Sequence, residues 1–360
     1  MTIHEKLVEH SFPVNCKTTL GKFTFYIFIL IDFFASLREM IFIFNISHAE
    51  VPMKYIFGPV PSRRLGLSLG IDIIPFKTCT LSCVYCQLGD TSRTTLERRE
   101  YTPVTEVLAE LRAFLAENPR IEWITFSGSG EPTLHSGLGA LIRGIKAMTA
   151  IPVCVITNGT LLSDPSVRRD LLEADAVMPS LDAACEDTFR AVCRPAPDLR
   201  AADIISGLAD FRMEYRGKLW LEILLVAGLN DTPEELKALR DATRTINPDA
   251  VQLNTVARPP ADRSAFPLSP ERMEEIRRFF GGKAEVIASF AAEGEAGTGR
   301  TADDVLASVK RHPGSADEIA AALGMEKEEV ERMLEELEGE GKVRVVEHGG
   351  RRFWEGAKNT

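Results

Sequence analysis

The sequence predicts an α/β protein built on an open barrel of six β–α units, two units short of the closed eight-fold TIM barrel. Two observations predict this fold. Short β-rich runs alternate with longer helical patterns from residue 65 onward, and polar or glycine-rich residues follow the β-rich runs. Regular alternation implies parallel strands joined by right-handed crossovers. The polar residues that follow the strands imply a site at the carboxyl ends of the strands.

Each unit combines one apolar run with one or two helical segments. The first run, residues 67–74, ends at Pro75. The first helix is expected at 103–117, with Thr102 as its N-cap and apolar residues at helical spacing. The other strands are expected at residues 121–126, 152–157, 176–181, 219–227 and 250–256, and the other helices at 136–149, 164–173, 185–192, 200–214, 232–245 and 270–280.

The 360-residue chain divides into four segments. Residues 1–52 hold apolar runs that charged residues interrupt, and none reaches the ~18 to 20 apolar residues of a membrane-spanning helix. We expect this extension to reflect an upstream start codon or a poorly packed segment, with a weak membrane-surface segment as the alternative. Residues 53–290 form the expected barrel, 291–300 are expected to be a linker, and 301–360 form a separate domain.

The C-terminal segment resembles a winged-helix domain, because three short helical patterns precede a β-prone hairpin. The third helix usually contacts nucleic acid in such domains. Here it is rich in glutamate and would repel phosphate. We therefore expect this domain to contact protein rather than DNA, with Arg351 and Arg352 of the hairpin as the exception. The helical patterns cover residues 302–311, 315–323 and 326–340.

Composition and charge limit the class of protein. A hydrophobic fraction of 45% and a charged fraction of 26% are those of a soluble globular protein. The net charge of −10 argues against a large electrostatic contact with nucleic acid. Seven cysteines in a chain this long do not suggest a disulfide framework, and clustered thiols fit a reducing cytosol. We expect a cytoplasmic protein without stable membrane insertion.

Three cysteines, Cys79, Cys83 and Cys86, lie within eight residues. Thiolate is a soft ligand that suits zinc or iron–sulfur clusters. A structural zinc site usually takes four ligands as two separated pairs, and an ordinary cluster takes a fourth cysteine nearby. The next cysteine here is Cys154. Three ligands on a four-iron cluster leave one iron open to a substrate or cofactor. A zinc knuckle or chance clustering is the alternative.

This spacing, with the aromatic Tyr85 before the last cysteine, resembles the signature of the radical S-adenosylmethionine (SAM) enzymes, whose fold is also an open (β/α)6 barrel. The resemblance implies that Cys79, Cys83 and Cys86 each bind one iron of a [4Fe–4S] cluster and that SAM takes the open iron. An electron from a reducing partner, such as a flavodoxin or ferredoxin, then cleaves SAM to a 5′-deoxyadenosyl radical, which abstracts a hydrogen atom.

The resemblance also implies where SAM binds. Gly128, Gly130 and Glu131 resemble the family's glycine-rich motif that receives the methionine amino group, with a simple strand-to-helix turn as the alternative. For the other positions, turns, helix caps and strand-end packing are the alternative roles. The other expected cofactor-binding residues are Tyr85, Thr157, Asn158, Ser180, Asp182, Val226 and Asn230, and the candidates for a substrate pocket are Arg63, Arg64, Glu222, Gln252, Asn254 and Arg258.

Residues 57–66, with 70–72 and 86–89, resemble a narrower group of uncharacterised radical SAM proteins related to the wyosine-base-forming enzymes of tRNA. We expect a radical SAM oxidoreductase whose substrate is a small molecule, a protein or tRNA. One alternative is tRNA base modification of the wyosine type. Another is a non-enzymatic iron–sulfur sensor with a regulatory winged helix. The downstream cysteines Cys154, Cys185 and Cys193 are expected to be buried and free.

Overall fold

The computed structural model describes residues 53–62, 64–117, 119–287, 301–311 and 313–357. The expected N-terminal extension, residues 1–52, and the expected linker, residues 291–300, lie outside the described residues. No helix within the described ranges is long and apolar enough to cross a membrane.

An eight-stranded sheet forms the centre of the fold, in the order β1-β2-β5-β6-β7-β8-β9-β10. Neighbouring strands are parallel throughout, except that β1 and β2 are antiparallel. A separate short pair, β3 with β4, lies beside the first cysteine. The strands are β1 (Ile56–Ser62), β2 (Gly66–Ile71), β3 (Thr78–Cys79), β4 (Arg93–Thr94), β5 (Trp123–Phe126), β6 (Val153–Thr157), β7 (Ala176–Pro179), β8 (Lys218–Leu225), β9 (Ala250–Thr255) and β10 (Ala284–Val286).

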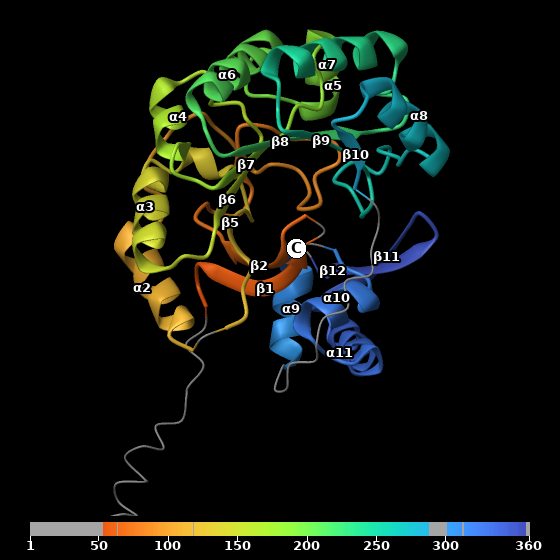
Figure 1. Ribbon diagram of the computed structural model, residues 1–360. Helices are drawn as coiled ribbons and strands as arrows, with labels where there is room; N and C mark the ends of the chain where they lie inside the picture. Colours follow the sequence, from red (N-terminus) through yellow and green to blue (C-terminus); the bar gives the residue numbers. More distant parts are fainter. Residues whose placement is uncertain (1–52, 63, 118, 288–300, 312, 358–360) are drawn as a thin grey trace, which may run out of the picture. The chain divides into compact units, whose positions relative to one another are not determined.

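Helices connect the parallel strands and cover the outer face of the curved sheet, as Figure 1 shows. The six strands expected from the sequence are all present and correspond to β2 and β5 through β9. The two edge strands, β1 and β10, were not expected. The helices are α2 (Val104–Leu115), the 3-10 turn η1 (Pro132–Leu134), α3 (Leu138–Met148), α4 (Pro165–Leu171), α5 (Glu186–Cys193), α6 (Ala201–Glu214), α7 (Pro233–Ile246) and α8 (Pro270–Phe280).

Alternation along the strands separates two apolar layers. Residues such as Leu69, Ile124 and Leu221 are buried in the large core that the helices also contribute to. The intervening positions, among them Cys154 and Met178, form a smaller cluster on the opposite face of the sheet. Successive strand residues point to opposite faces, and a parallel sheet is normally covered on both. Both faces of this sheet therefore carry buried apolar side chains.

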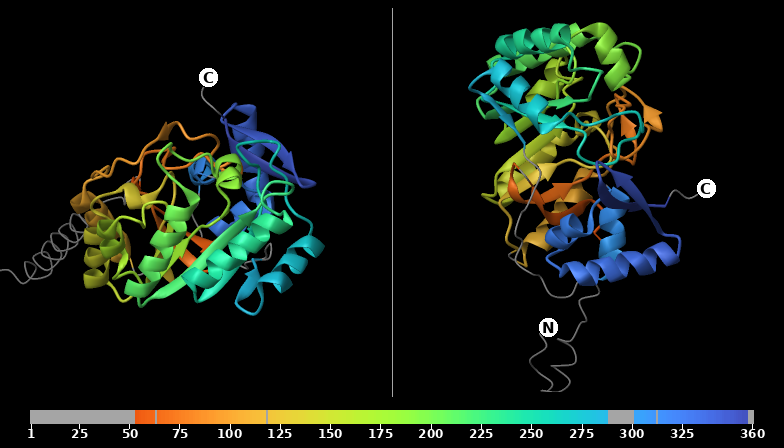
Figure 2. Two further views of the ribbon diagram at one scale, coloured as in Figure 1. Left: turned by 90° about the horizontal axis from the view of Figure 1, so that it is seen from above. Right: turned by 90° about the vertical axis from the view of Figure 1, so that its right-hand side faces the viewer.

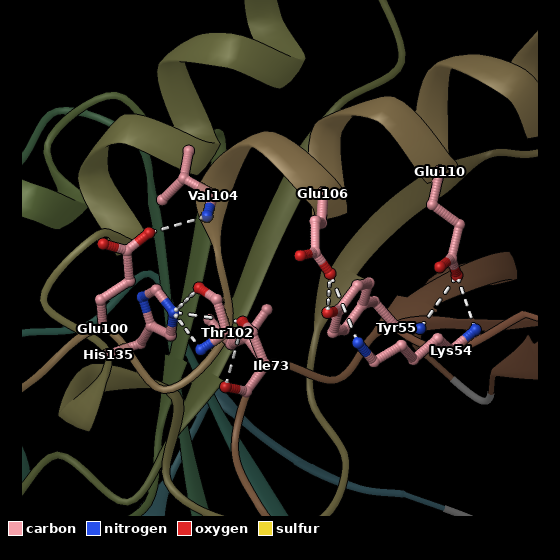
Figure 3. Close-up of polar contacts among 9 residues, drawn as sticks. All are labelled: Lys54, Tyr55, Ile73, Glu100, Thr102, Val104, Glu106, Glu110 and His135. Atoms are coloured by element: carbon pink, nitrogen blue, oxygen red, sulfur yellow. Dashed lines mark hydrogen bonds and ion pairs between the residues drawn. The ribbon is translucent and has the colours of Figure 1, made fainter.

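Helix α2 holds the start of β1 through polar contacts, shown in Figure 3. Glu110 Oε1 accepts hydrogen bonds from the backbone N–H groups of Lys54, Tyr55 and Ile56, at 2.9–3.0 Å. The Tyr55 hydroxyl donates to Glu106 Oε2 at 2.5 Å, and this bond is the main cause that lowers the pKa of Glu106. One carboxylate on α2 thus satisfies three backbone donors that precede or begin the edge strand.

The prediction that Thr102 is the N-cap of α2 is wrong. Helix α2 begins at Val104, and Pro103 occupies its N-cap position without a capping side chain. Glu100 Oε1 accepts the Val104 N–H at 2.9 Å, and the Thr102 hydroxyl instead lies 3.2 Å from Nε2 of His135 (Figure 3). A carboxylate from the preceding turn satisfies the first free N–H of the helix in place of the hydroxyl.

The C-terminal region has its own apolar core, which includes Val305, Val330, Leu334 and Trp354. A capping box of Ser315 with Glu318 starts α10. Figure 2 shows these blue elements gathered in one body. The elements are α9 (Ala302–Arg311), α10 (Ala316–Leu323), α11 (Lys327–Gly339), β11 (Val343–His348) and β12 (Arg351–Gly356).

Two polar contacts link this region to the loop that follows β9. His348 Nε2 donates to the carbonyl oxygen of Val256 at 2.9 Å, and Arg258 Nε lies 3.5 Å from Glu318 Oε2. Helix α10 also packs against β1. The C-terminal elements therefore contact segments from both the first and the last parts of the sheet.

Candidate functional site

The three motif cysteines lie in one loop at the carboxyl side of β3. Cys79 is the last residue of that strand, and Cys86 N–H donates to the Cys83 carbonyl at 3.1 Å. All three cysteines are half-buried and free. In the part of the chain that the structure describes, no group of three or more His, Cys, Asp or Glu residues that could hold a metal ion is found. A four-iron cluster is bound through one iron per cysteine, so it differs from the single metal ion that such a group would hold.

The loop is fixed by backbone contacts with the end of α5. Ser82 N–H donates to the Cys193 carbonyl at 3.0 Å, and Val84 N–H donates to the Val192 carbonyl at 2.9 Å. These bonds hold the loop independently of its cysteine side chains. The sulfurs are thus carried on a backbone that the surrounding fold positions.

Two of the three sulfurs lie within hydrogen-bond distance of a donor. N–H donors beside thiolate sulfurs stabilise their negative charge and tune an attached metal centre. These surroundings fit an iron–sulfur cluster with cysteine ligands. The two pairs are Lys77 Nζ to Cys86 Sγ at 3.4 Å and Asn158 Nδ2 to Cys79 Sγ at 3.5 Å.

Burial disfavours the charged form of these thiols when no metal is bound. It raises the pKa of the Cys79 thiol to about 12, with the nearby Glu131 carboxylate as the next cause. Burial also raises the pKa of Cys86, against the opposing effect of Lys77. The contact with Cys83, followed by burial, raises the pKa of Cys193. Binding of iron to Cys79 and Cys86 must therefore displace protons.

The glycines after β5 permit close backbone approach. Gly128 has φ +136°, and a Cβ there would lie 2.5 Å from Asp72 Cγ. A Cβ on Gly130 would lie 2.0 Å from the carbonyl oxygen of Thr78. Ser129, between them, donates its N–H to Asp72 Oδ2 at 3.1 Å. The glycine-rich loop therefore packs directly onto the strand that ends at the first cysteine.

Glu131 joins this loop to the end of β6. Its carboxylate is buried, and burial is the main cause that raises its pKa. Oε1 accepts hydrogen bonds from the hydroxyls of Thr133 and Thr157, both at 2.6 Å, and from the Thr133 N–H at 3.0 Å. Oε2 accepts the Asn158 N–H at 2.7 Å. Three of the expected cofactor-binding residues, Glu131, Thr157 and Asn158, are thus brought together by one carboxylate.

Asp182 joins the fourth and fifth strand ends to the cysteine loop. Tyr85 donates its hydroxyl to Asp182 Oδ2, and the Leu224 N–H donates to Oδ1 at 2.8 Å. Burial raises the pKa of Asp182 to about 7. Asp182, Ser180 and Asn158 line one small cavity of about 10 Å³, room for roughly one water molecule. Three of the expected residues therefore line the space beside the cysteine loop.

Asn230 and Val226 are more deeply placed than the other candidates. The Asn230 side chain is fully buried, accepts the Val226 N–H at 2.7 Å, and donates to the carbonyls of Asp182 and Leu224, both at 2.8 Å. These bonds close the turn after β8. The cofactor role expected for both residues stays a prediction, and the observed role is to hold the chain next to Asp182.

The polar residues expected to face a substrate are already paired. Arg64 Nη1 lies 2.5 Å from Glu222 Oε2 and 3.3 Å from Gln252 Oε1, and Asn254 Nδ2 donates to Glu222 Oε1 at 3.1 Å. Arg258 lies apart from this group, 3.4 Å from Gln87 Oε1 beside the cysteine loop. Arg63 is outside the described residues.

Two features of the site differ from the sequence analysis. Cys185, at the N-cap position of α5, is exposed rather than buried, whereas Cys154 and Cys193 are buried as expected. Lys77 was not identified as a site residue. A lysine two positions before the first cysteine was the only available signal, and nothing in its spacing indicates that it turns back to Cys86.

Comparison with known proteins identifies the family. Residues 73–242 match the family model described as the radical SAM superfamily. The UPF0026 protein MJ1312 of Methanocaldococcus jannaschii is 32% identical over 309 residues, covering 84% of this chain and 96% of that protein. The dual-specificity RNA methyltransferase RlmN of Oleidesulfovibrio alaskensis is 26% identical over 214 residues, covering 56% of this chain and 57% of that protein.

A longer relative matches over only part of its length. The protein named GTPase Obg of Brachyspira hyodysenteriae is 40% identical over 304 residues, which is 83% of this chain but 45% of that protein. The chain thus spans less than half of this relative and nearly all of the archaeal one. The radical SAM superfamily uses a [4Fe–4S] cluster and SAM. The chain belongs to the UPF0026 family and is a member of the radical SAM superfamily.

Proposed function

We propose that this protein is a radical SAM enzyme whose single [4Fe–4S] cluster is held by Cys79, Cys83 and Cys86, with one iron left for SAM. When bound, this pair of cofactors supplies a 5′-deoxyadenosyl radical that abstracts a hydrogen atom from the substrate. The observation that carries the proposal is that Lys77 and Asn158 place hydrogen-bond donors at the Cys86 and Cys79 sulfurs.

The residues around the loop have separable tasks. Gly128 and Gly130 bring the backbone close to the cluster loop, where carbonyls can accept hydrogen bonds from an ammonium group. Glu131 fixes Thr157 and Asn158 in place through buried hydrogen bonds. Asp182 accepts the Tyr85 hydroxyl and so ties the chain after β7 to the cysteine loop, and Ser180 lines the same small cavity.

A larger cavity offers room for a substrate. It has a volume of about 1620 Å³ and is lined by Gln87, Leu88 and Gly89, the residues directly after the last cysteine. Its other walls include Pro259, Pro260 and the β11–β12 hairpin. Its walls carry both acidic and basic groups, and it exceeds the ~300–1,000 Å³ of ordinary small-molecule pockets. We therefore leave the substrate class open and place substrate entry on this side.

We propose that the sheet and its covering helices form an open (β/α)6 partial barrel, because β1 and β10 end the sheet and do not pair with each other. We describe the C-terminal elements as a winged-helix domain with a protein-contacting role. Six glutamates in α11 support that role. The reductant would be a flavodoxin or ferredoxin, and clustered thiols support a cytoplasmic location.

Modification of RNA is the second candidate, and the similarity to an RNA methyltransferase favours it. The C-terminal hairpin gives it little support. Arg351 lies 3.4 Å from Glu318, and Arg352 lies 3.8 Å from Glu338. Cations already paired with carboxylates are poor phosphate ligands. Retention of radiolabelled tRNA by the purified protein at physiological salt would favour this candidate.

The test is anaerobic reconstitution with iron and sulfide, then addition of dithionite and SAM, and chromatography for 5′-deoxyadenosine. We expect product from the wild type and none above background from Cys83→Ser. Cys185→Ser is the matched control, because Cys185 is exposed and lies outside the loop. A fully loaded cluster that yields no 5′-deoxyadenosine would favour the sensor interpretation.

A further inference from the structure

Lys77 carries a positive charge into the interior next to the cysteine loop. Only 4% of the residue is exposed. Its Nζ lies 3.4 Å from Cys86 Sγ and also donates to the Gly89 carbonyl. Among the ion pairs of the described residues, none joins Lys77 to a carboxylate. A buried ammonium group is costly unless an anion compensates it. The thiolate that iron binding creates at Cys86 supplies such an anion.

The backbone of Lys77 is held as firmly as its side chain. Lys77 adopts φ +59°. Its N–H donates to the Ser129 carbonyl at 2.8 Å, and its own carbonyl accepts the Arg93 N–H at 3.0 Å. A left-handed conformation at a residue with a Cβ persists only where the surroundings impose it. The lysine is therefore fixed between the glycine-rich loop and β4, with its ammonium group directed to one cysteine.

The Cys79 sulfur has a neutral donor, the side-chain amide of Asn158. A charged donor stabilises added negative charge more than a neutral one. Electron uptake makes the cluster with its thiolates more negative, and hydrogen bonds to the sulfurs raise the reduction potential. Of the two donors, Lys77 should have the larger effect.

We propose that Lys77 is a positioning residue for electron uptake: its buried ammonium group, hydrogen-bonded to Cys86, raises the reduction potential of the cluster so that a weak biological reductant can supply the electron. This inference rests on the proposed function, because it requires the cluster. It assigns a role to a residue outside the cysteine motif.

The test is a redox titration of the reconstituted protein, followed by electron paramagnetic resonance of the reduced cluster. Lys77→Met removes the charge, Lys77→Gln keeps a neutral donor, and Lys77→Arg keeps the charge. All three replacements retain a Cβ, so the cost of the left-handed backbone is unchanged. The control is Lys237→Met, which removes the same charge from the exposed surface of α7.

We expect Lys77→Met to lower the equilibrium constant for one-electron reduction at least tenfold, about 59 mV in potential. Lys77→Gln should fall between Lys77→Met and the wild type, and Lys77→Arg and Lys237→Met should stay within threefold of the wild type. A Lys77→Met cluster with an unchanged potential would overturn the inference. So would equal loss of iron from all three Lys77 variants, because that result indicates a steric role. A wild type that binds no [4Fe–4S] cluster would instead overturn the proposed function.

Discussion

Two buried polar groups in this protein differ in how their charges are balanced. In the first, between the β1–β2 turn and the middle of the sheet, Arg64 lies against Glu222, with Gln252 and Asn254 beside them. In the second, at the cysteine loop, Lys77 lies against the Cys86 sulfur and a carbonyl. The first group contains a cation and its counter-charge. The second contains the Lys77 cation, whose described partners are neutral as long as Cys86 is a thiol. Iron binding would convert this thiol to a thiolate.

The first group therefore has a structural role and the second a functional one. A buried ion pair that is already complete holds the fold in one arrangement and has little charge left for a ligand. A buried cation beside a protonated thiol gains its counter-charge when iron binds. The Glu131 carboxylate likewise accepts four hydrogen bonds. It therefore organises the site rather than presenting a free charge.

The largest effect on stability is expected at the complete pair. Arg64→Ala removes the cation that lies 2.5 Å from the buried Glu222 carboxylate, and we expect it to lower the free energy of unfolding by about 3–5 kcal/mol, because removing one partner of a buried ion pair is costly. Replacing both residues, by Arg64→Met with Glu222→Leu, should recover most of this loss. Arg244→Ala, which breaks an exposed pair with Asp241, is the control and should cost about 1 kcal/mol or less. Denaturant titration measures all three, and a loss under 1 kcal/mol for Arg64→Ala would contradict the comparison.

A smaller effect is expected at the carboxylate that joins the glycine-rich loop to β6. Glu131→Gln turns one of two acceptor oxygens into a donor that faces another donor, at a cost of about 1–3 kcal/mol. The affinity for SAM should fall as well, because Thr157 and Asn158 lose their common partner. Calorimetric titration with SAM and denaturant unfolding measure the two effects. Glu122→Gln, at an exposed carboxylate that accepts the Leu67 N–H, is the control, and equal losses in both variants would contradict the assigned role.

The smallest effect is a pH dependence from His135. Burial lowers the pKa of His135 from 6.5, and the nearby Arg98 acts in the same direction, while the hydrogen bond with the Thr102 carbonyl and the Glu100 carboxylate oppose it. Nδ1 accepts the Gly137 N–H at 3.0 Å, and Nε2–H donates to the Thr102 carbonyl at 2.9 Å, so the neutral ring fits its surroundings. The unfolded chain therefore binds this proton more tightly. The contribution of His135 to the free energy of unfolding is fully present above about pH 6.5. It is lost as the pH falls through the lower pKa of the folded state, and the free energy changes by no more than about 1.4 kcal/mol per pH unit.

Unfolding at a series of pH values tests this expectation. The wild type should lose stability below pH 6.5 relative to His135→Gln, which has no proton to bind in that range. Parallel curves for the two proteins would show that the ring at position 135 does not contribute.

Local patterns in the sequence predicted much of the fold. The six apolar runs became β2 and β5 through β9 because alternating strands and helices leave few alternative arrangements. The edge strands were missed for physical reasons. Strand β1 contains Pro59 and Pro61, which interrupt a strand pattern, and β10 has only three residues.

The site was predictable where spacing along the chain carries the information. The cysteines and the glycine-rich loop have such spacing, and the structure brings Glu131, Asn158 and Asp182 to the same strand ends. The contact of Lys77 with Cys86 was not predictable, because it depends on a left-handed residue that folds the chain back. The pairing of Thr102 with His135 depends likewise on two loops that meet only in the folded chain.

The central claim is that the three cysteines hold a [4Fe–4S] cluster with one iron open to SAM. The most direct measurement is iron and sulfide analysis of the reconstituted protein, together with electron paramagnetic resonance of the reduced cluster before and after SAM is added. We expect four irons and four sulfides per chain, from the cluster formula, and a spectrum that changes when SAM binds. A single bound zinc ion, or a cluster whose spectrum does not respond to saturating SAM, would contradict the claim.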